Sequence, residues 1–227
     1  MKKLPANIDS FLLPTAYLPP LEYLVCLLIA PAVTIELHET FPRQTWRNRC
    51  SIYSANGRLD LTIPVDKPQG NHTKTHSVMP SHHAHWQLKH WRSIQAAYRN
   101  APFYIYYQDL LEPFYMKTTR LALWEYNLVM LRVILEELSI SVPIQTTTSF
   151  EVQPGHCLDL RNAITPKVHR REKPTLSFLP PYHQIFADRH GFISNLSVVD
   201  LLFHVGPDSH AYLIETANYF TGYPSEG

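Results

Sequence analysis

The chain has 227 residues, enough for one compact domain with a substantial core. Its hydrophobic content of 45% and charged content of 17% are typical of a globular protein and exclude a largely disordered one. The formal net charge of +1 argues against a dedicated DNA-binding protein, which would carry a strong basic excess, so we expect no nucleic-acid partner.

The cysteines and the apolar runs further limit the class of protein and its location. Cys26, Cys50 and Cys157 are far apart and form no CxxC pair, which argues against structural zinc and a disulfide framework. The apolar run at 21–30 is shorter than the roughly 20 residues of a membrane span, and polar residues interrupt the basic start. We therefore expect a cytoplasmic protein without membrane insertion, folded as a single domain over 1–227 with a loose tail at 217–227.

The first part of the chain predicts a strand, a helix and a second strand. Residues 10–13 are typical of a short buried strand, and 21–29 are apolar on every side, as in a buried helix that Pro31 ends. Residues 32–37 then alternate between apolar and polar side chains. So short a sequence of elements favours a parallel unit, in which ligands gather at the carboxyl ends of the strands.

The clearest local signal is a β-hairpin over 49–65. Two alternating runs flank Asn56-Gly57, a pair favoured in two-residue hairpin turns. We expect Leu59, Leu61, Ile63 and Val65 to face the core. The predicted fold class is α/β, one domain whose mixed sheet holds the strand-helix-strand unit and the hairpin and is covered by helices; the alternative is α+β.

The aromatic stretch 85–115 predicts two short helices that meet at 100–102. Trp86, His90, Ile94 and Ala97 recur at helical spacing and should face a core. A second face carries a basic stripe, formed by His85, Lys89, Arg92 and Arg99. Downstream, the predicted elements are a helix at 120–138 with Thr118 or Thr119 as N-cap, a strand at 143–150, an ordered loop at 153–181, a helix at 198–205 with a Ser197–Asp200 capping box, and a final helix at 207–217.

Three arginines near the hairpin are candidates for anion binding. Arg43, Arg47 and Arg49 carry guanidinium forks, which suit phosphate or carboxylate because each fork donates parallel charge-assisted hydrogen bonds. Together with the basic stripe they predict a phosphorylated or nucleotide-linked sugar as ligand. The alternative to a binding site is that these arginines are only hydrated side chains at one end of the hairpin. Tyr17 and Tyr182 lie in proline-rich connectors and are the preferred aromatic binding residues.

The histidines invite a metal hypothesis that the sequence does not support. His82, His83 and His85 could offer imidazoles, but no nearby carboxylate or cysteine completes a set, so we expect a solvated loop, no metal and no cofactor. His90 lies on the apolar helix face, where a hydrogen-bonded core histidine competes with a general base. Asp200 is open to two interpretations, an acid partner or a helix cap.

Several segments together resemble the WbqC-like protein family. The segments that carry the resemblance, in chain order, are 15–23 (TAYLPPLEY), 44–49 (QTWRNR), 61–65 (LTIPV), 89–94 (KHWRSI), 97–104 (AYRNAPFY) and 195–197 (NLS). Many members have a Gln-Pro pair ahead of the tyrosine, whereas Leu13-Pro14 stands there in this chain. No role for that glutamine amide is carried over.

The resemblance implies a protein of bacterial surface-polysaccharide (O-antigen) clusters that acts on an activated amino sugar and adds an acyl or aminoacyl group. Direct transfer would need a base and donors for the oxyanion, and His90 and Asn48 are the catalytic candidates. The binding candidates are Tyr17, Arg43, Trp46, Arg47, Arg49, His85, Lys89, Arg92 and Tyr182. A non-catalytic sugar- or nucleotide-binding module and a scaffold of a glycan-assembly complex remain alternatives. We expect Tyr17, Arg47, Asn48, Lys89 and Arg92 to converge on one concave pocket.

Overall fold

A parallel sheet of four strands forms one side of the domain. The computed structural model describes residues 8–81, 85–118, 120–155, 157–166 and 175–221. The strands are β1 (Ser10–Pro14), β2 (Val33–Glu36), β7 (Ile144–Thr146) and β8 (Cys157–Asp159). They are ordered β7-β2-β1-β8, and all three neighbouring pairs are parallel. The parallel pairing of the first two strands confirms the predicted strand-helix-strand unit.

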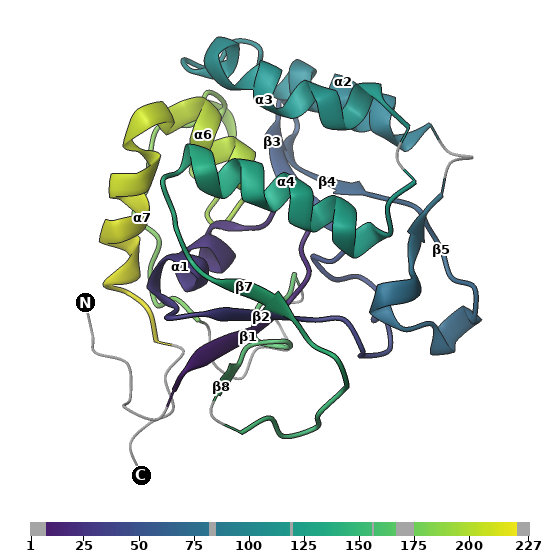
Figure 1. Cartoon of the computed structure of the whole chain (residues 1–227). Helices are drawn as coiled ribbons and strands as arrows, with labels where there is room; N and C mark the ends of the chain where they lie inside the picture. Colours follow the sequence, from purple (N-terminus) through teal and green to yellow (C-terminus); the bar gives the residue numbers. More distant parts are fainter. Residues whose placement is uncertain (1–7, 82–84, 119, 156, 167–174, 222–227) are drawn as a thin grey trace.

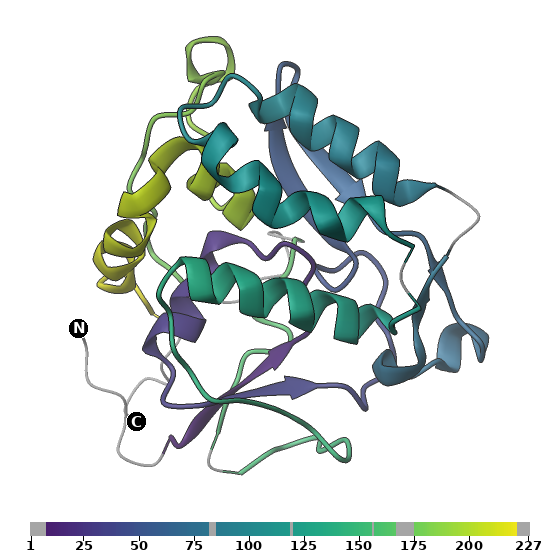
Figure 2. The same cartoon turned by 45° about the horizontal axis from the view of Figure 1, so that its top comes forward.

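The two faces of this sheet differ in character. Alternation along β1 and β2 buries Phe11 and Val33 on one face and places Ser10 and Thr34 on the other. Helices α1 (Leu21–Ile29) and α4 (Leu123–Glu137) lie on the apolar side, and the segment between β7 and β8 passes beneath the opposite side (Figures 1 and 2). Side chains of the second face are therefore available to form a site.

The predicted hairpin is present but does not extend the parallel sheet. Strands β3 (Arg49–Ser54) and β4 (Gly57–Thr62) pair as a separate two-stranded sheet around a turn at Ala55-Asn56, one residue before the expected Asn56-Gly57. The expectation of one shared sheet was wrong, whereas the α/β class is confirmed. Leu61 and Ile63 are buried as expected, but Leu59 is 36% exposed although strand alternation places it on the same face as Leu61. A second small pair joins β5 (Val65–Asp66) to β6 (Met79–Pro80).

The aromatic stretch forms the two predicted helices, α2 (Trp86–Tyr98) and α3 (Tyr104–Met116). All four apolar-face residues of α2 are buried, as the helical spacing predicted. The remaining helices are α5 (Ala187–His190), α6 (Val198–Val205) and α7 (Ser209–Ala217). Gly206 ends α6 at φ +61, and a Cβ there would collide with the Phe103 ring, so the position requires glycine.

Two predicted helix caps are not formed. Helix α4 begins after Ala122, whose backbone N–H donates to Glu125 Oε2, so Thr118 is not its cap; Thr119 lies outside the described residues. At α6, the Ser197 hydroxyl donates to the Leu18 carbonyl, while the Asp200 carboxylate is used elsewhere. Local spacing suggested these caps, but at α6 the Ser197 and Asp200 side chains form hydrogen bonds with residues outside the helix.

The chain stays ordered beyond the last helix. Phe220 is buried and stacks on Phe11 with ring centroids 6.0 Å apart. This part of the expected loose tail at 217–227 is therefore packed on the first strand, while 222–227 lie outside the described residues. Within the part of the chain that the structure describes, no helix combines the length and apolar character needed to cross a bilayer.

Candidate functional site

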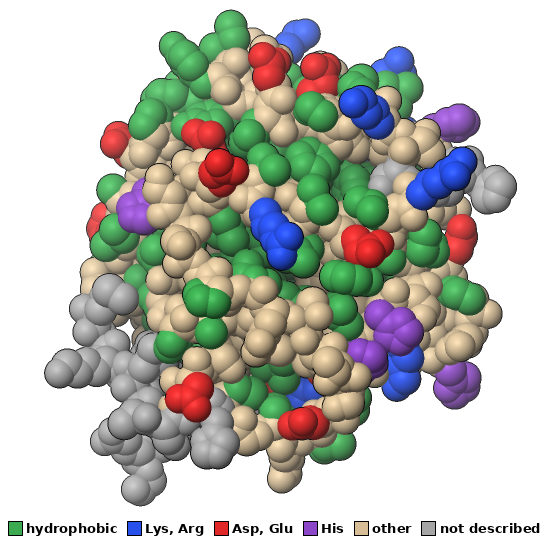
Figure 3. All heavy atoms as spheres, in the orientation of Figure 1, with side chains coloured by type: hydrophobic (Ala, Val, Ile, Leu, Met, Phe, Trp, Pro, Cys, Tyr) green, Lys and Arg blue, Asp and Glu red, His purple; other side chains and the backbone are tan. Residues whose placement is uncertain are grey.

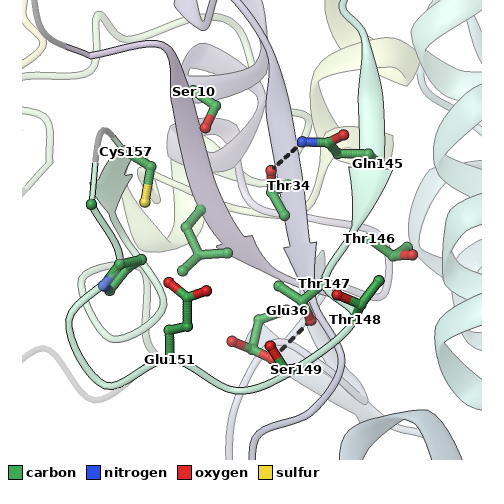
Figure 4. A pocket seen from close by; sticks show the side chains of 13 residues that line it. Ser10, Thr34, Glu36, Gln145, Thr146, Thr147, Thr148, Ser149, Glu151 and Cys157 are labelled. Carbon is green, nitrogen blue, oxygen red and sulfur yellow. Dashed lines mark hydrogen bonds between the residues drawn. The ribbon is translucent and has the colours of Figure 1, made fainter.

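A polar pocket of about 360 Å³ lies on the open face of the parallel sheet (Figure 4). It is bounded by strand residues and by the segment that joins β7 to β8. The lining residues are Ser10, Leu12, Thr34, Glu36, Gln145, Thr146, Thr147, Thr148, Ser149, Glu151, Pro154, Gly155 and Cys157. The pocket extends from the strands to the loop after their carboxyl ends, the edge where parallel sheets gather ligands.

Strand alternation explains why the pocket is polar. Ser10 and Leu12 on β1, Thr34 and Glu36 on β2, and Gln145 on β7 all face this side. The Gln145 amide donates from Nε2 to Thr34 Oγ1 at 3.1 Å, which orients the amide and leaves its carbonyl oxygen as an acceptor. Hydroxyls of the following threonine and serine run continue the polar rim.

The Glu36 carboxylate forms part of the pocket wall and is fully engaged. Its Oε1 accepts from the His38 backbone N–H at 2.7 Å and from the Thr147 hydroxyl at 3.0 Å, and its Oε2 accepts from Arg161 Nη1 at 3.0 Å. Arg161 also donates from Nη2 to Asp159 Oδ2 at 2.6 Å. These carboxylates raise the pKa of Arg161, the Asp159 contact most strongly, so its charge is permanent. The network supports the pocket rather than offering free groups to a ligand.

Arg161 also fixes the loop that covers the pocket. Its Nη1 donates to the Glu151 carbonyl at 2.9 Å, and its guanidinium carbon lies 5.0 Å from the centroid of the Phe150 ring. The backbone of Glu151 is thereby held, while its side chain is exposed and points from the loop toward the strands (Figure 4). A held backbone with an accessible carboxylate suits a binding group.

Cys157 contributes a thiol to the same pocket. Burial raises its pKa, and the neighbouring Asp159 raises it further, so the thiol stays protonated near neutral pH. A protonated thiol is a weak nucleophile, which argues against an acyl-enzyme on this residue. Among the described lining residues there is no Lys, Arg or His. The set of hydroxyls, one amide and carboxylates matches a polyhydroxylated ligand better than a phosphate.

Arg47, predicted to bind a ligand, is instead buried and paired. Its side chain is 2% exposed, and it donates to Glu39 from Nε at 2.6 Å and from Nη2 at 2.8 Å. The Asn127 amide donates to the Arg47 carbonyl at 2.8 Å. This bidentate pair uses the guanidinium fork on the protein itself and ties the 43–48 loop to the chain that follows β2.

Tyr17 and His90 are brought together, though not in a pocket. The Tyr17 hydroxyl lies 2.9 Å from His90 Nδ1 and 2.8 Å from the Tyr115 hydroxyl, and all three side chains are buried. Burial lowers the pKa of His90 to about 4, although a hydrogen bond with the Thr62 backbone acts in the opposite direction. Burial also raises the pKa of Tyr17. The geometry is that of a hydrogen-bonded core histidine, the alternative weighed for His90 in the sequence.

The other loop candidates are held by the protein as well. The Asn48 amide donates to the Ile63 carbonyl at 2.8 Å, and Arg43 donates to the Asn71 side chain at 2.8 Å. Arg49 is half-buried and contacts Asp60 at 3.5 Å. Trp46 is buried beneath Arg58, whose guanidinium carbon lies 5.8 Å from the indole centroid.

Tyr182 belongs to a buried cluster around Asp200. Its hydroxyl donates to Asp200 Oδ2 at 2.6 Å, and Tyr98 and Gln184 donate to the same carboxylate at 2.8 and 2.7 Å. Burial raises the pKa of Tyr182, with the Asp200 charge adding to the effect. Asp200 is fully buried, so it is neither the predicted helix cap nor an accessible acid.

The basic stripe is exposed on α2, where Figure 3 shows Lys and Arg side chains along one edge of the molecule. His85, Lys89 and Arg92 are all exposed there, so the expected convergence with buried Arg47 and Tyr17 does not occur. Their role in binding stays a prediction. His82 and His83 lie outside the described residues. Among those described, no group of three His, Cys, Asp or Glu side chains could hold a metal.

The pocket residues were not predicted from the sequence. Thr34, Glu36, Gln145 and Glu151 carry no motif, and their shared position becomes visible only when β7 and β8 join the sheet beside β2 and β1. One signal was available, since parallel strands place ligands at their carboxyl ends and polar residues alternate along 32–37.

Comparison with known proteins gives a family but no characterised activity. The sequence model of the WbqC-like protein family matches residues 15–173. Over 196 residues the chain is 25% identical to the "Uncharacterized protein Rv1507c" of Mycobacterium tuberculosis. The alignment covers 76% of this chain and 83% of the relative. No solved structure matches.

Proposed function

Since the chain belongs to the WbqC-like protein family, we propose that it acts in the biosynthesis of a bacterial surface polysaccharide of the O-antigen type. Family membership supports the coarser statement, an association with polysaccharide clusters. The finer proposal is that the protein, as one domain in the cytoplasm, binds a nucleotide-activated amino sugar and transfers an acyl or aminoacyl group to its amine.

The observation that carries this proposal is the polar pocket on the open face of the sheet. A sugar ring presents hydroxyls that both donate and accept, and Thr34, Gln145 and Ser149 offer matching hydroxyl and amide groups around a 360 Å³ space. Because Arg161 is committed to Glu36 and Asp159, phosphates of a nucleotide sugar should extend out of this pocket. The sugar, rather than the nucleotide, is the part that the pocket suits.

A direct transfer fits these residues better than a covalent acyl-enzyme. The pKa of the Cys157 thiol is raised, and the buried His90 ring is already bonded to Tyr17. The amine of a bound sugar would therefore attack the donor carbonyl itself. None of the described lining residues of the pocket is a histidine. This favours the second candidate function, a sugar-binding module without turnover.

Titration with UDP-glucosamine tests the binding step. Calorimetry should show saturable binding, and Thr34→Val should weaken it about threefold to tenfold, since it removes one hydroxyl from the pocket. Thr118→Val is the matched control, because Thr118 is exposed near the end of α3 and should leave affinity unchanged. Equal losses in both variants, or no binding by the wild type, would contradict the assigned site.

Product analysis separates the enzyme from the binding module. The protein is incubated with UDP-glucosamine and an acyl thioester, and the sugar is examined by mass spectrometry. A protein-dependent gain of one acyl group supports transfer. Binding without any mass change in a panel of acyl and aminoacyl donors favours the module.

A further inference from the structure

We propose that Glu151 forms a subsite for a primary ammonium group, so that the pocket selects sugars with a free amine over N-acylated ones. This inference rests on the proposed function and assigns the recognition of its amine to one residue.

Glu151 differs from the other carboxylates of this region. The two oxygens of Glu36 accept three hydrogen bonds, one of them from Arg161. Asp159 binds the same guanidinium through both oxygens, at 2.9 and 2.6 Å. The Glu151 side chain has neither an ion pair nor a hydrogen bond among the described residues, and it points into the cavity (Figure 4). It is the carboxylate left for a ligand.

The backbone of Glu151 is held in place before any ligand arrives. Arg161 donates to the Glu151 carbonyl at 2.9 Å and to the Val152 carbonyl at 3.4 Å, while Phe150 packs over the guanidinium. Such an arrangement lowers the ordering cost of binding, because the loop that carries the carboxylate is already fixed.

Charge and chemistry around Glu151 both favour a cation. The carboxylates of Glu36 and Asp159 pair with the guanidinium of Arg161, and Glu151 adds a further negative charge at the pocket. The Lys74 ammonium packs 5.9 Å from the Phe150 ring centroid and does not line the cavity. An ammonium donates three hydrogen bonds, which one carboxylate and neighbouring neutral oxygens can accept. A phosphate in the same place would meet acceptors and negative charge.

The subsite also gives a reason for product release. Before transfer, the bound ammonium gives one proton to solvent, because only the neutral amine can attack the thioester. Its attack forms the amide C–N bond and breaks the C–S bond, and the departing thiolate takes up the second proton of the amine as a thiol. The amine that Glu151 holds is charged, whereas the amide product is neutral. The product therefore loses its charged contact with Glu151 as the reaction completes, and substrate should displace it.

The test compares two ligands that differ at the amine. We measure the affinities of UDP-glucosamine and UDP-N-acetylglucosamine for wild type, Glu151→Gln and the control Glu215→Gln, an exposed carboxylate on α7. Glu151→Gln should weaken UDP-glucosamine about twofold to fivefold, because the contact is solvent-exposed, and should change UDP-N-acetylglucosamine less than twofold. The control should change neither.

The outcomes distinguish this inference from the proposed function. If Thr34→Val weakens both ligands while Glu151→Gln weakens neither, or weakens both equally, the ammonium subsite is wrong and the sugar pocket stands. If wild type binds neither ligand, both proposals are overturned. Urea unfolding of Glu151→Gln checks that the variant is folded, and its exposed side chain predicts a wild-type midpoint.

Discussion

Two polar regions of this domain use similar side chains in opposite ways. On the helix-covered side, the hydroxyls and imidazole of Tyr17, His90 and Tyr115 satisfy one another in a buried cluster. On the open face of the sheet, polar groups surround a cavity, and the Glu151 carboxylate has no partner among the described residues. Buried polar groups whose hydrogen bonds are all formed stabilise a fold. Polar groups around a cavity that lack hydrogen-bond partners can instead recognise a ligand. The comparison separates residues that shape the protein from those that serve its function.

The largest effect should follow from breaking the buried ion pair. Arg47→Ala leaves the Glu39 carboxylate, which is only 11% exposed, without its bidentate partner. Removing one member of a buried pair typically costs about 3–5 kcal/mol, so urea unfolding should show a loss of that size. A ligand-binding Arg47, as expected from the sequence, would affect binding more than stability, whereas its pairing with Glu39 predicts the reverse.

Arg49→Ala is the control for this prediction. Arg49 lies two residues further along and contacts Asp60 at 3.5 Å in a half-exposed position. Its removal should cost about 0–1 kcal/mol, as for surface pairs. If Arg47→Ala is as stable as Arg49→Ala and instead loses sugar binding, the division between the two regions fails.

The second prediction uses pH to probe the buried cluster. Burial lowers the pKa of His90 to about 4, below the value of about 6.5 expected when unfolded. The unfolded chain therefore binds more protons between these values, and stability falls as pH decreases through this range. Linkage gives a loss of about 3 kcal/mol from His90 between pH 6.5 and pH 4. The neighbouring Tyr17 and Tyr115 have raised pKa values and remain neutral throughout.

The measurement is the free energy of unfolding at pH 7, 6, 5 and 4 for wild type and His90→Gln. Wild type should lose about 3 kcal/mol more than the variant over this interval. Burial lowers the pKa of His204 as well, but this residue is common to both proteins and cancels in the difference. Parallel pH profiles would show that the His90 ring is accessible to protons in the folded state and so belongs to a functional region.

Sequence periodicity predicted elements better than it predicted the site. Burial of Trp86, His90 and Ile94 followed from their helical spacing, and Asn56-Gly57 predicted the hairpin, although the turn lies one residue earlier. The pocket depends on β7 and β8 joining β2 and β1, which are more than 100 residues away in the chain. The guanidinium of Arg47 has the same chemistry whether it binds Glu39 or a phosphate. Only the three-dimensional partner decides between them.

The smallest expected effect concerns the basic stripe, and it tests the comparison most directly. Arg92 is exposed on α2, on the helix-covered side of the molecule and away from the sheet pocket (Figure 1). Arg92→Ala should therefore change the free energy of unfolding by less than about 0.5 kcal/mol, as surface substitutions do. Its affinity for UDP-glucosamine should equal that of wild type if the sugar lies in the sheet pocket. The site predicted from the sequence gives a different value, because losing an arginine fork from a phosphate site weakens binding roughly tenfold to a hundredfold. Calorimetry on Arg92→Ala beside Thr34→Val thus decides between the two sites. A loss of affinity confined to Arg92→Ala would place the ligand on the basic face of α2. A loss of affinity confined to Thr34→Val would show that the ligand does not bind to that face.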